Sequence, residues 1–89
     1  MPKITTTALP CSQSEVVARY FEALDHLLAA GRIDSLRKFS ERYHIVRQNM
    51  LRLRNDPERK FDLRFLTILV IDYDIKAEWL LTGQGKRGF

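Results

Sequence analysis

The sequence has little of what several protein classes require. Its single cysteine, Cys11, excludes an internal disulfide and a zinc site built on several cysteines. No apolar run reaches the roughly 18 residues of a membrane-spanning helix, and the first residues have no apolar stretch typical of a secretory signal. At 89 residues the chain is too short for two hydrophobic cores. We therefore expect one small, soluble, cytoplasmic domain with no membrane partner.

Positive charge is concentrated in the middle of the chain. The sequence carries 15 Lys and Arg against 11 Asp and Glu, a formal net charge of +4. Residues 32–64 hold ten basic and five acidic side chains, so this stretch has a net charge of +5 and the rest of the chain a net charge of −1. Clustered arginine is typical of phosphate recognition, although an ordinary solvated surface remains the alternative.

The spacing of apolar residues predicts a long first helix. Apolar residues recur at steps of three and four from Val17 to Leu28, as on a helix with one buried face. Ser12 and Glu15 form a capping-box pattern at its start. Gly31 supplies a left-handed stop.

Four shorter helices are expected to follow, which makes the fold class all-α. Asp34 is the predicted N-cap of the second helix and Asp62 that of the fourth. The expected limits are Asp34 to Tyr43, Arg47 to Arg54, Leu63 to Tyr73 and Lys76 to Leu81, in a domain of residues 12–83 with a flexible leader (1–11) and a flexible tail (84–89).

The stretch Leu63 to Tyr73 is apolar on nearly every side. Its β-branched residues would also suit a buried strand. No second strand is available to pair with it, and a lone strand is not stable, so we expect a helix. A helix that is apolar all round is expected to lie centrally in the core.

The two short helices around His44 carry the functional prediction, because two helices joined by a short turn form a helix-turn-helix. Ser40 supplies a small residue where they cross. The second of them has a thin apolar edge and a broad polar face, which suits the major groove of B-DNA. The residues expected to pack inward are Phe39, Tyr43, Ile45, Met50 and Leu53.

The stretch LRKFSERYHIVRQNMLRL (36–53) and the more specific ending EWLLTG (78–83) resemble a known family. They are similar to the Cro/repressor-type (XRE-like) helix-turn-helix domain of bacterial and phage transcriptional regulators, over residues 15–83. The resemblance implies a compact five-helix, lambda-repressor-like bundle whose third helix reads double-stranded DNA. It also implies a regulator associated with the nucleoid when bound to DNA.

The resemblance implies two groups of DNA-contacting residues. Arginine can bond bidentately to guanine and glutamine to adenine, whereas phosphate contacts position the protein. Base contacts are expected from Val46, Arg47, Gln48, Leu51 and Arg52. Phosphate contacts are expected from Arg37, Lys38, Arg54, Arg59 and Lys60.

We also expect a homodimer on a pseudo-palindromic site, because one such domain buries too little surface for useful specificity. The half-sites would lie about 34 Å apart. Exposed parts of the first helix or of residues 73–82 are the candidate interfaces.

Three residues depart from the family's pattern. His44 stands where the family has glycine in the turn, so it must adopt positive φ at a cost of about 1 kcal/mol, or the turn is reshaped. Val46 stands where the family often has a capping Ser or Thr, which weakens the anchoring of the third helix by roughly 1 kcal/mol. Lys76 stands where the family favours Ser before the last helix.

The main alternative is a protein-interaction module of the same fold that no longer reads DNA, and His44 and Val46 favour it. An enzyme is not expected, because no nucleophile, base and orienting group converge. His26 follows Asp25, but neighbours in a helix point about 100° apart and no nucleophile accompanies them.

No metal, cofactor or small-molecule ligand is expected. Asp72, Asp74 and Glu78 lack the glycine turn of a cation loop, so a solvated acidic patch is the simpler interpretation. Trp79 and the other aromatics fall mostly on core positions, which disfavours stacking on single-stranded RNA. Lys3 to Thr7 could form a minor-groove arm, but one lysine favours a disordered leader.

Overall fold

The computed structural model describes residues 12–89, and in this range the chain forms five α-helices and no β-strand, which confirms the predicted all-α class. The predictions for the leader, for Cys11 and for a minor-groove arm lie outside the described residues. The helices are α1 (Gln13–Ala29), α2 (Leu36–Arg42), α3 (Arg47–Asn55), α4 (Arg64–Tyr73) and α5 (Ala77–Thr82).

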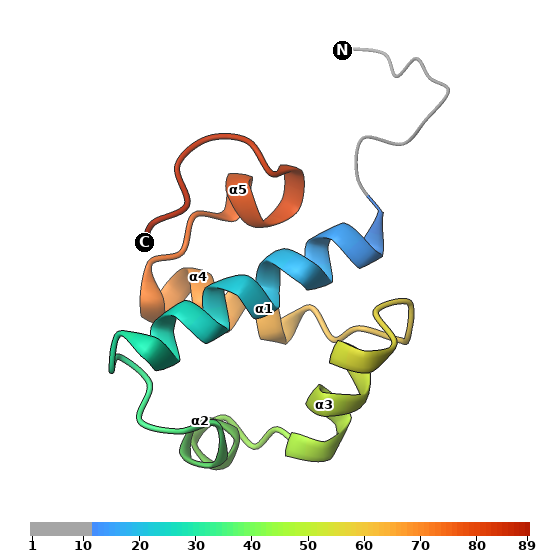
Figure 1. Ribbon diagram of the computed structural model, residues 1–89, viewed down its shortest axis with the longest axis vertical. Helices are drawn as coiled ribbons and strands as arrows, with labels where there is room; N and C mark the ends of the chain where they lie inside the picture. The colour runs from blue at the N-terminus through green and yellow to red at the C-terminus, as the bar shows by residue number, and fades with distance from the viewer. Residues whose placement is uncertain (1–11) are drawn as a thin grey trace.

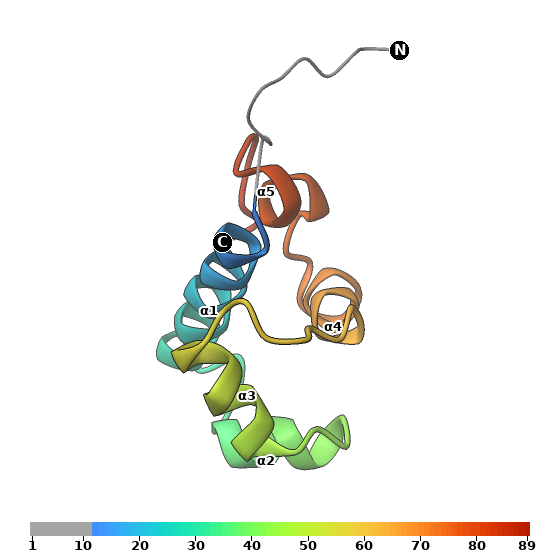
Figure 2. The same ribbon diagram turned by 90° about the vertical axis from the view of Figure 1, so that its right-hand side faces the viewer.

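Helix α1 runs through the middle of the molecule, with α5 at one end of the long axis and α2 and α3 at the other (Figures 1 and 2). It contacts α3 and α5, while α2 contacts α3 and α4 contacts α5. Six side chains of α1 are buried, more than on any other helix. None of the described helices is long and apolar enough to cross a membrane.

The start and end of α1 follow the sequence prediction. The Ser12 hydroxyl accepts a hydrogen bond from the Glu15 amide at 3.3 Å, and the Glu15 carboxylate accepts one from the Ser12 amide at 3.4 Å. This reciprocal pair is the predicted capping box. Gly31 has φ +79°, the left-handed conformation expected after the last turn.

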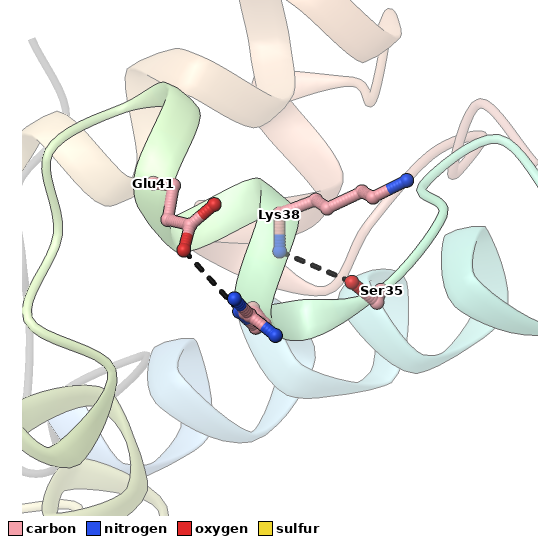
Figure 3. Close-up of polar contacts among 4 residues, drawn as sticks. Ser35, Lys38 and Glu41 are labelled. Carbon is pink, nitrogen blue, oxygen red and sulfur yellow. Dashed lines mark hydrogen bonds and ion pairs between the residues drawn. The ribbon is translucent and has the colours of Figure 1, made fainter.

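The predicted N-cap of α2 was wrong by one residue. Ser35, not Asp34, has the extended backbone, and its hydroxyl accepts a hydrogen bond from the Lys38 amide at 3.1 Å (Figure 3). The Asp34 carboxylate instead lies 4.0 Å from the Lys38 ammonium group. The predicted N-cap of α4 was also wrong by one residue, because Leu63 is the N-cap and its side chain forms no capping hydrogen bond. The Asp62 carboxylate, one position earlier, accepts a hydrogen bond from the Arg64 amide at 2.9 Å.

Helix α4 is not enclosed on all sides, contrary to the prediction from its composition. Phe65, Leu69 and Tyr73 are among its buried residues, but Ile71 is 77% exposed and Leu63, just before the helix, is 69% exposed. Helix α1 takes the central position, because it is the longest and packs between the ends of the molecule. One apolar side of α4 therefore faces outward beside α5.

The last residues lie against the bundle, whereas the prediction was a flexible tail. The Phe89 ring lies 5.3 Å from the ring of the buried Trp79 and 4.5 Å from that of His26, measured between centroids. The Arg87 guanidinium lies 3.0 Å from the Glu22 carboxylate on α1. Trp79 is thus a core residue, as expected.

Candidate nucleic-acid interface

The turn between α2 and α3 is closed by a left-handed residue. His44 has φ 56°, so of the two expected alternatives, a positive φ or a reshaped turn, the chain takes the positive φ. This conformation lets the Ile45 amide donate to the Ser40 carbonyl at 2.8 Å, and the Ile45 side chain is buried beneath the turn. The direction in which α3 leaves α2 is therefore set by the backbone of these residues.

Helix α3 is held by a narrow apolar edge. Only Met50 and Leu53 are buried on it, as predicted. Its N-cap residue, Val46, provides no side-chain hydrogen bond to the first turn, which is also the predicted result. Little of α3 is needed for the core, so most of its surface is open to another molecule.

The exposed face of α3 lies opposite Met50 and Leu53. Successive residues are about 100° apart around a helix, so the side farthest from the buried edge is centred on Gln48 and Asn55. Asn55 lies outside the predicted helix, which ended at Arg54, and was not predicted as a contact, although the same spacing identifies it. The exposed face also holds Arg47, Leu51 and Arg52, all predicted base-contacting residues.

The polar side chains on this face have no partner within the described part of the chain. Arg47, Gln48 and Arg52 form no side-chain hydrogen bond or ion pair with residues 12–89. In contrast, the Arg37 guanidinium on α2 lies 3.3 Å from the Glu41 carboxylate, the contact drawn at Glu41 in Figure 3. The charges of Arg47 and Arg52 therefore have no counterpart among residues 12–89.

Two hollows flank the turn between α2 and α3. One, of about 530 Å³, is lined by Arg37 and Arg47 among others, with His44 at its edge. The other, of about 690 Å³, brings Arg59 and Lys60 of the loop after α3 beside Val46, Asn49 and His44. Three of the five predicted phosphate-contacting residues therefore lie on either side of the predicted base-contacting residues.

The other two predicted phosphate-contacting residues are placed differently. The Arg54 guanidinium lies 2.7 Å from the Asp25 carboxylate and 4.5 Å from the centroid of the Phe21 ring, both on α1. Arg54 is only about 40° from Met50 around the helix, which turns it toward α1. Lys38 lines a separate hollow with Arg32 and Arg42 and does not join the others.

A hydrogen bond ties the end of α2 to α4. The Tyr43 hydroxyl donates to the Asp72 carboxylate at 2.5 Å. Burial, and then this bond to a carboxylate, raise the pKa of Tyr43 above its usual value. In the core, burial raises the pKa of Tyr20, and its hydroxyl and that of Ser40 are buried without a hydrogen-bond partner among the described residues.

The chemistry of this site is that of recognition through cations and amides. No group of three or more His, Cys, Asp or Glu side chains in residues 12–89 is arranged to hold a metal ion. No protein-family model matches the chain, and neither curated proteins nor solved structures give a match.

Proposed function

We propose that this chain is a sequence-specific double-stranded DNA-binding protein, a transcriptional regulator of the Cro/repressor type. In this proposal α2 and α3 form a helix-turn-helix, and α3 lies in the major groove. One observation carries the proposal: the broad exposed face of α3 presents Arg47, Gln48 and Arg52 without partners in residues 12–89. The proposed role is binding rather than catalysis, in the cytoplasm of a bacterium or on a phage-encoded protein at the nucleoid.

The residue types on the α3 face suit the edges of base pairs. An arginine fork can donate two hydrogen bonds to guanine, and a glutamine amide can both donate to and accept from adenine. Val46, 60% exposed, and Leu51, 42% exposed, offer apolar contacts for the thymine methyl group. A ligand that combines negative charge, hydrogen-bonding edges and methyl groups fits this mixture better than a uniformly acidic surface does.

The flanking hollows suit the phosphate backbone. Arg37 on one side, and Arg59 and Lys60 on the other, are proposed to contact phosphates and so fix the position of α3. Arg54 is proposed to hold α3 against α1 rather than to contact DNA, since its guanidinium is turned toward α1, where it meets the Asp25 carboxylate and the Phe21 ring. Two copies of the chain would bind half-sites about 34 Å apart, one helical turn of DNA.

The test is duplex binding by a double variant, Arg47→Ala with Arg52→Ala, measured by fluorescence anisotropy on a selected site. Each lost bidentate contact weakens discrimination by about 1–3 kcal/mol, so we expect at least a tenfold loss of specific affinity with an unchanged melting temperature. The matched control is Arg32→Ala with Arg42→Ala, which removes the same charge from a separate hollow. If both double variants lose affinity equally, α3 does not read the bases.

A protein-interaction module is the second candidate. The exposed apolar side chains of Val46 and Leu51 favour it, because they would also suit a groove on another protein. This candidate predicts no sequence-specific duplex binding by the unmodified chain. The anisotropy measurement therefore separates the two functions.

A further inference from the structure

An uncharged groove lies between α4 and α5. No residue of α3 lines it, although Leu63 at one end also lines the hollow beside Val46 and Asn49. The groove has a volume of about 310 Å³, and its lining contains no charged side chain, with Thr67 as the one polar residue. Ile71, Leu63 and Leu81 stand on its walls with 77%, 69% and 48% of their surfaces exposed. Apolar surface gathered in this way on a small protein is typical of an interaction site.

Residues 12–89 leave Ile71 and Leu63 largely exposed. The buried residues of α4 and α5, such as Leu69 and Leu80, already fill the space toward α1. Nothing in the described part of the chain removes Ile71 from water. The hydrophobic effect favours an occupant that presents a similar apolar surface.

The charges around the groove are arranged in opposite pairs at its two ends. At the start of α4 the Arg64 guanidinium lies 3.4 Å from the Asp62 carboxylate, and beyond its end the Lys76 ammonium lies 3.6 Å from the Asp74 carboxylate. A two-fold axis through the middle of α4 would set two copies of this helix antiparallel. Arg64 of one copy would then face Asp74 of the other, and Asp62 would face Lys76.

We infer that the groove between α4 and α5 binds a second copy of this chain and forms the interface of a two-fold dimer. The rim is neutral and self-complementary, whereas the region around α2 and α3 carries the excess of positive charge and would repel its own copy. Helix α5 lies at the opposite end of the long axis from α2 and α3 (Figures 1 and 2), so this dimer leaves both α3 faces open. Only this last step rests on the proposed function.

Sedimentation equilibrium without DNA tests the interface. We expect the unmodified chain to dimerise with rising concentration, and Ile71→Glu to raise the dissociation constant at least about a hundredfold, because a carboxylate would be buried unpaired. A matched pair of substitutions is Leu81→Glu in the groove and Leu51→Glu on α3, at similar exposure (48% and 42%). The first should weaken the dimer, and the second should leave it unchanged.

Two results would overturn the inference: an unmodified chain that stays monomeric at the highest concentration reached, or a dimer that Ile71→Glu and Leu81→Glu leave intact. The first would mean that a different molecule covers the groove. Circular dichroism of each variant checks folding, and Leu63→Glu, at an exposed position before α4, serves if Ile71→Glu unfolds. A dimer that binds no duplex would refute the proposed function alone, and a monomer that binds single half-sites would refute the dimer alone.

Discussion

The α3 face and the α4–α5 groove both expose apolar side chains, but they differ in the charges beside them. Val46 and Leu51 on α3 stand among arginines that have no partner in residues 12–89. Ile71 and Leu81 stand in a groove without charged lining, and the nearby charges are paired. Free cations with apolar groups suit a polyanion with base edges, whereas an uncharged apolar groove suits another apolar surface. The comparison indicates two surfaces with two partners.

The largest expected effect is the difference in the free energy of unfolding between a substitution on the buried side of α4 and one on its exposed side. Leu69→Ala should lower the free energy of unfolding by about 2–5 kcal/mol, because Leu69 is fully buried and its loss leaves a cavity. Ile71→Ala should change it by less than about 0.5 kcal/mol in dilute solution, since that side chain is 77% exposed. Urea unfolding of both variants measures the difference, and equal losses would mean that the groove belongs to the core of the monomer.

The salt concentration should strongly affect duplex binding by the α3 face and hardly affect dimerisation through the α4–α5 groove. Duplex binding should weaken steeply with salt, and Arg47→Ala with Arg52→Ala should reduce the slope of log K against log salt by about 2. That change corresponds to roughly tenfold in affinity over a fourfold rise in salt. Dimerisation through an apolar groove should vary much less, because screening acts on charges. A dimer that dissociates as steeply with salt as the DNA complex would contradict the comparison.

The turn before α3 and the end of α4 each contain one residue that is left-handed without being glycine. His44 at the turn has φ 56°, and Asp74 at the end of α4 has φ 59°. His44→Gly and Asp74→Gly should each raise the free energy of unfolding by up to about 1 kcal/mol, because glycine adopts this conformation without strain. Thermal unfolding followed by circular dichroism measures the effect. A decrease for His44→Gly alone would mean that its side chain supports the turn.

The smallest effect is expected from the hydrogen bond between Tyr43 and Asp72, which joins the end of α2 to α4. Tyr43→Phe removes the hydrogen bond to Asp72 and should cost about 1 kcal/mol or less near neutral pH. The pKa of Tyr43 is raised in the folded chain, so its contribution is complete below pH about 10 and is lost as the pH rises further. Urea unfolding at neutral and alkaline pH should show a smaller alkaline loss for Tyr43→Phe than for the unmodified chain. The alkaline loss of stability that remains in Tyr43→Phe is assigned to Tyr20, because burial also raises the pKa of Tyr20. An equal alkaline loss in both proteins would contradict the role of Tyr43.

Much of the fold could be predicted because its signals are local. The capping box of Ser12 and Glu15 and the thin edge of Met50 and Leu53 both depend on residues within one or two turns. The positive φ of His44 was one of two alternatives that the family resemblance implied. Pattern alone could not rank Asp34 against Ser35, because both residue types cap helices well and the backbone of the preceding loop selects between them.

The features that could not be predicted depend on tertiary placement. Arg54 looked like a phosphate contact, but its partners Asp25 and Phe21 are about thirty residues away in the chain. The apolar composition of α4 indicated burial on all sides, yet it does not say which molecule covers Ile71. Periodicity identifies apolar faces, and only the arrangement of helices shows which of them the chain fills by itself.

Whether α3 reads sequence is measured by selection from random double-stranded DNA with the purified chain, at near-physiological salt. We expect an enriched motif of two inverted half-sites, with centres about one helical turn apart. With Ile71→Glu the same half-site should be recovered singly, and with Arg47→Ala and Arg52→Ala the enrichment should disappear. No enrichment by the unmodified chain, or binding to every duplex with equal salt-sensitive affinity, would contradict the claim that α3 reads sequence.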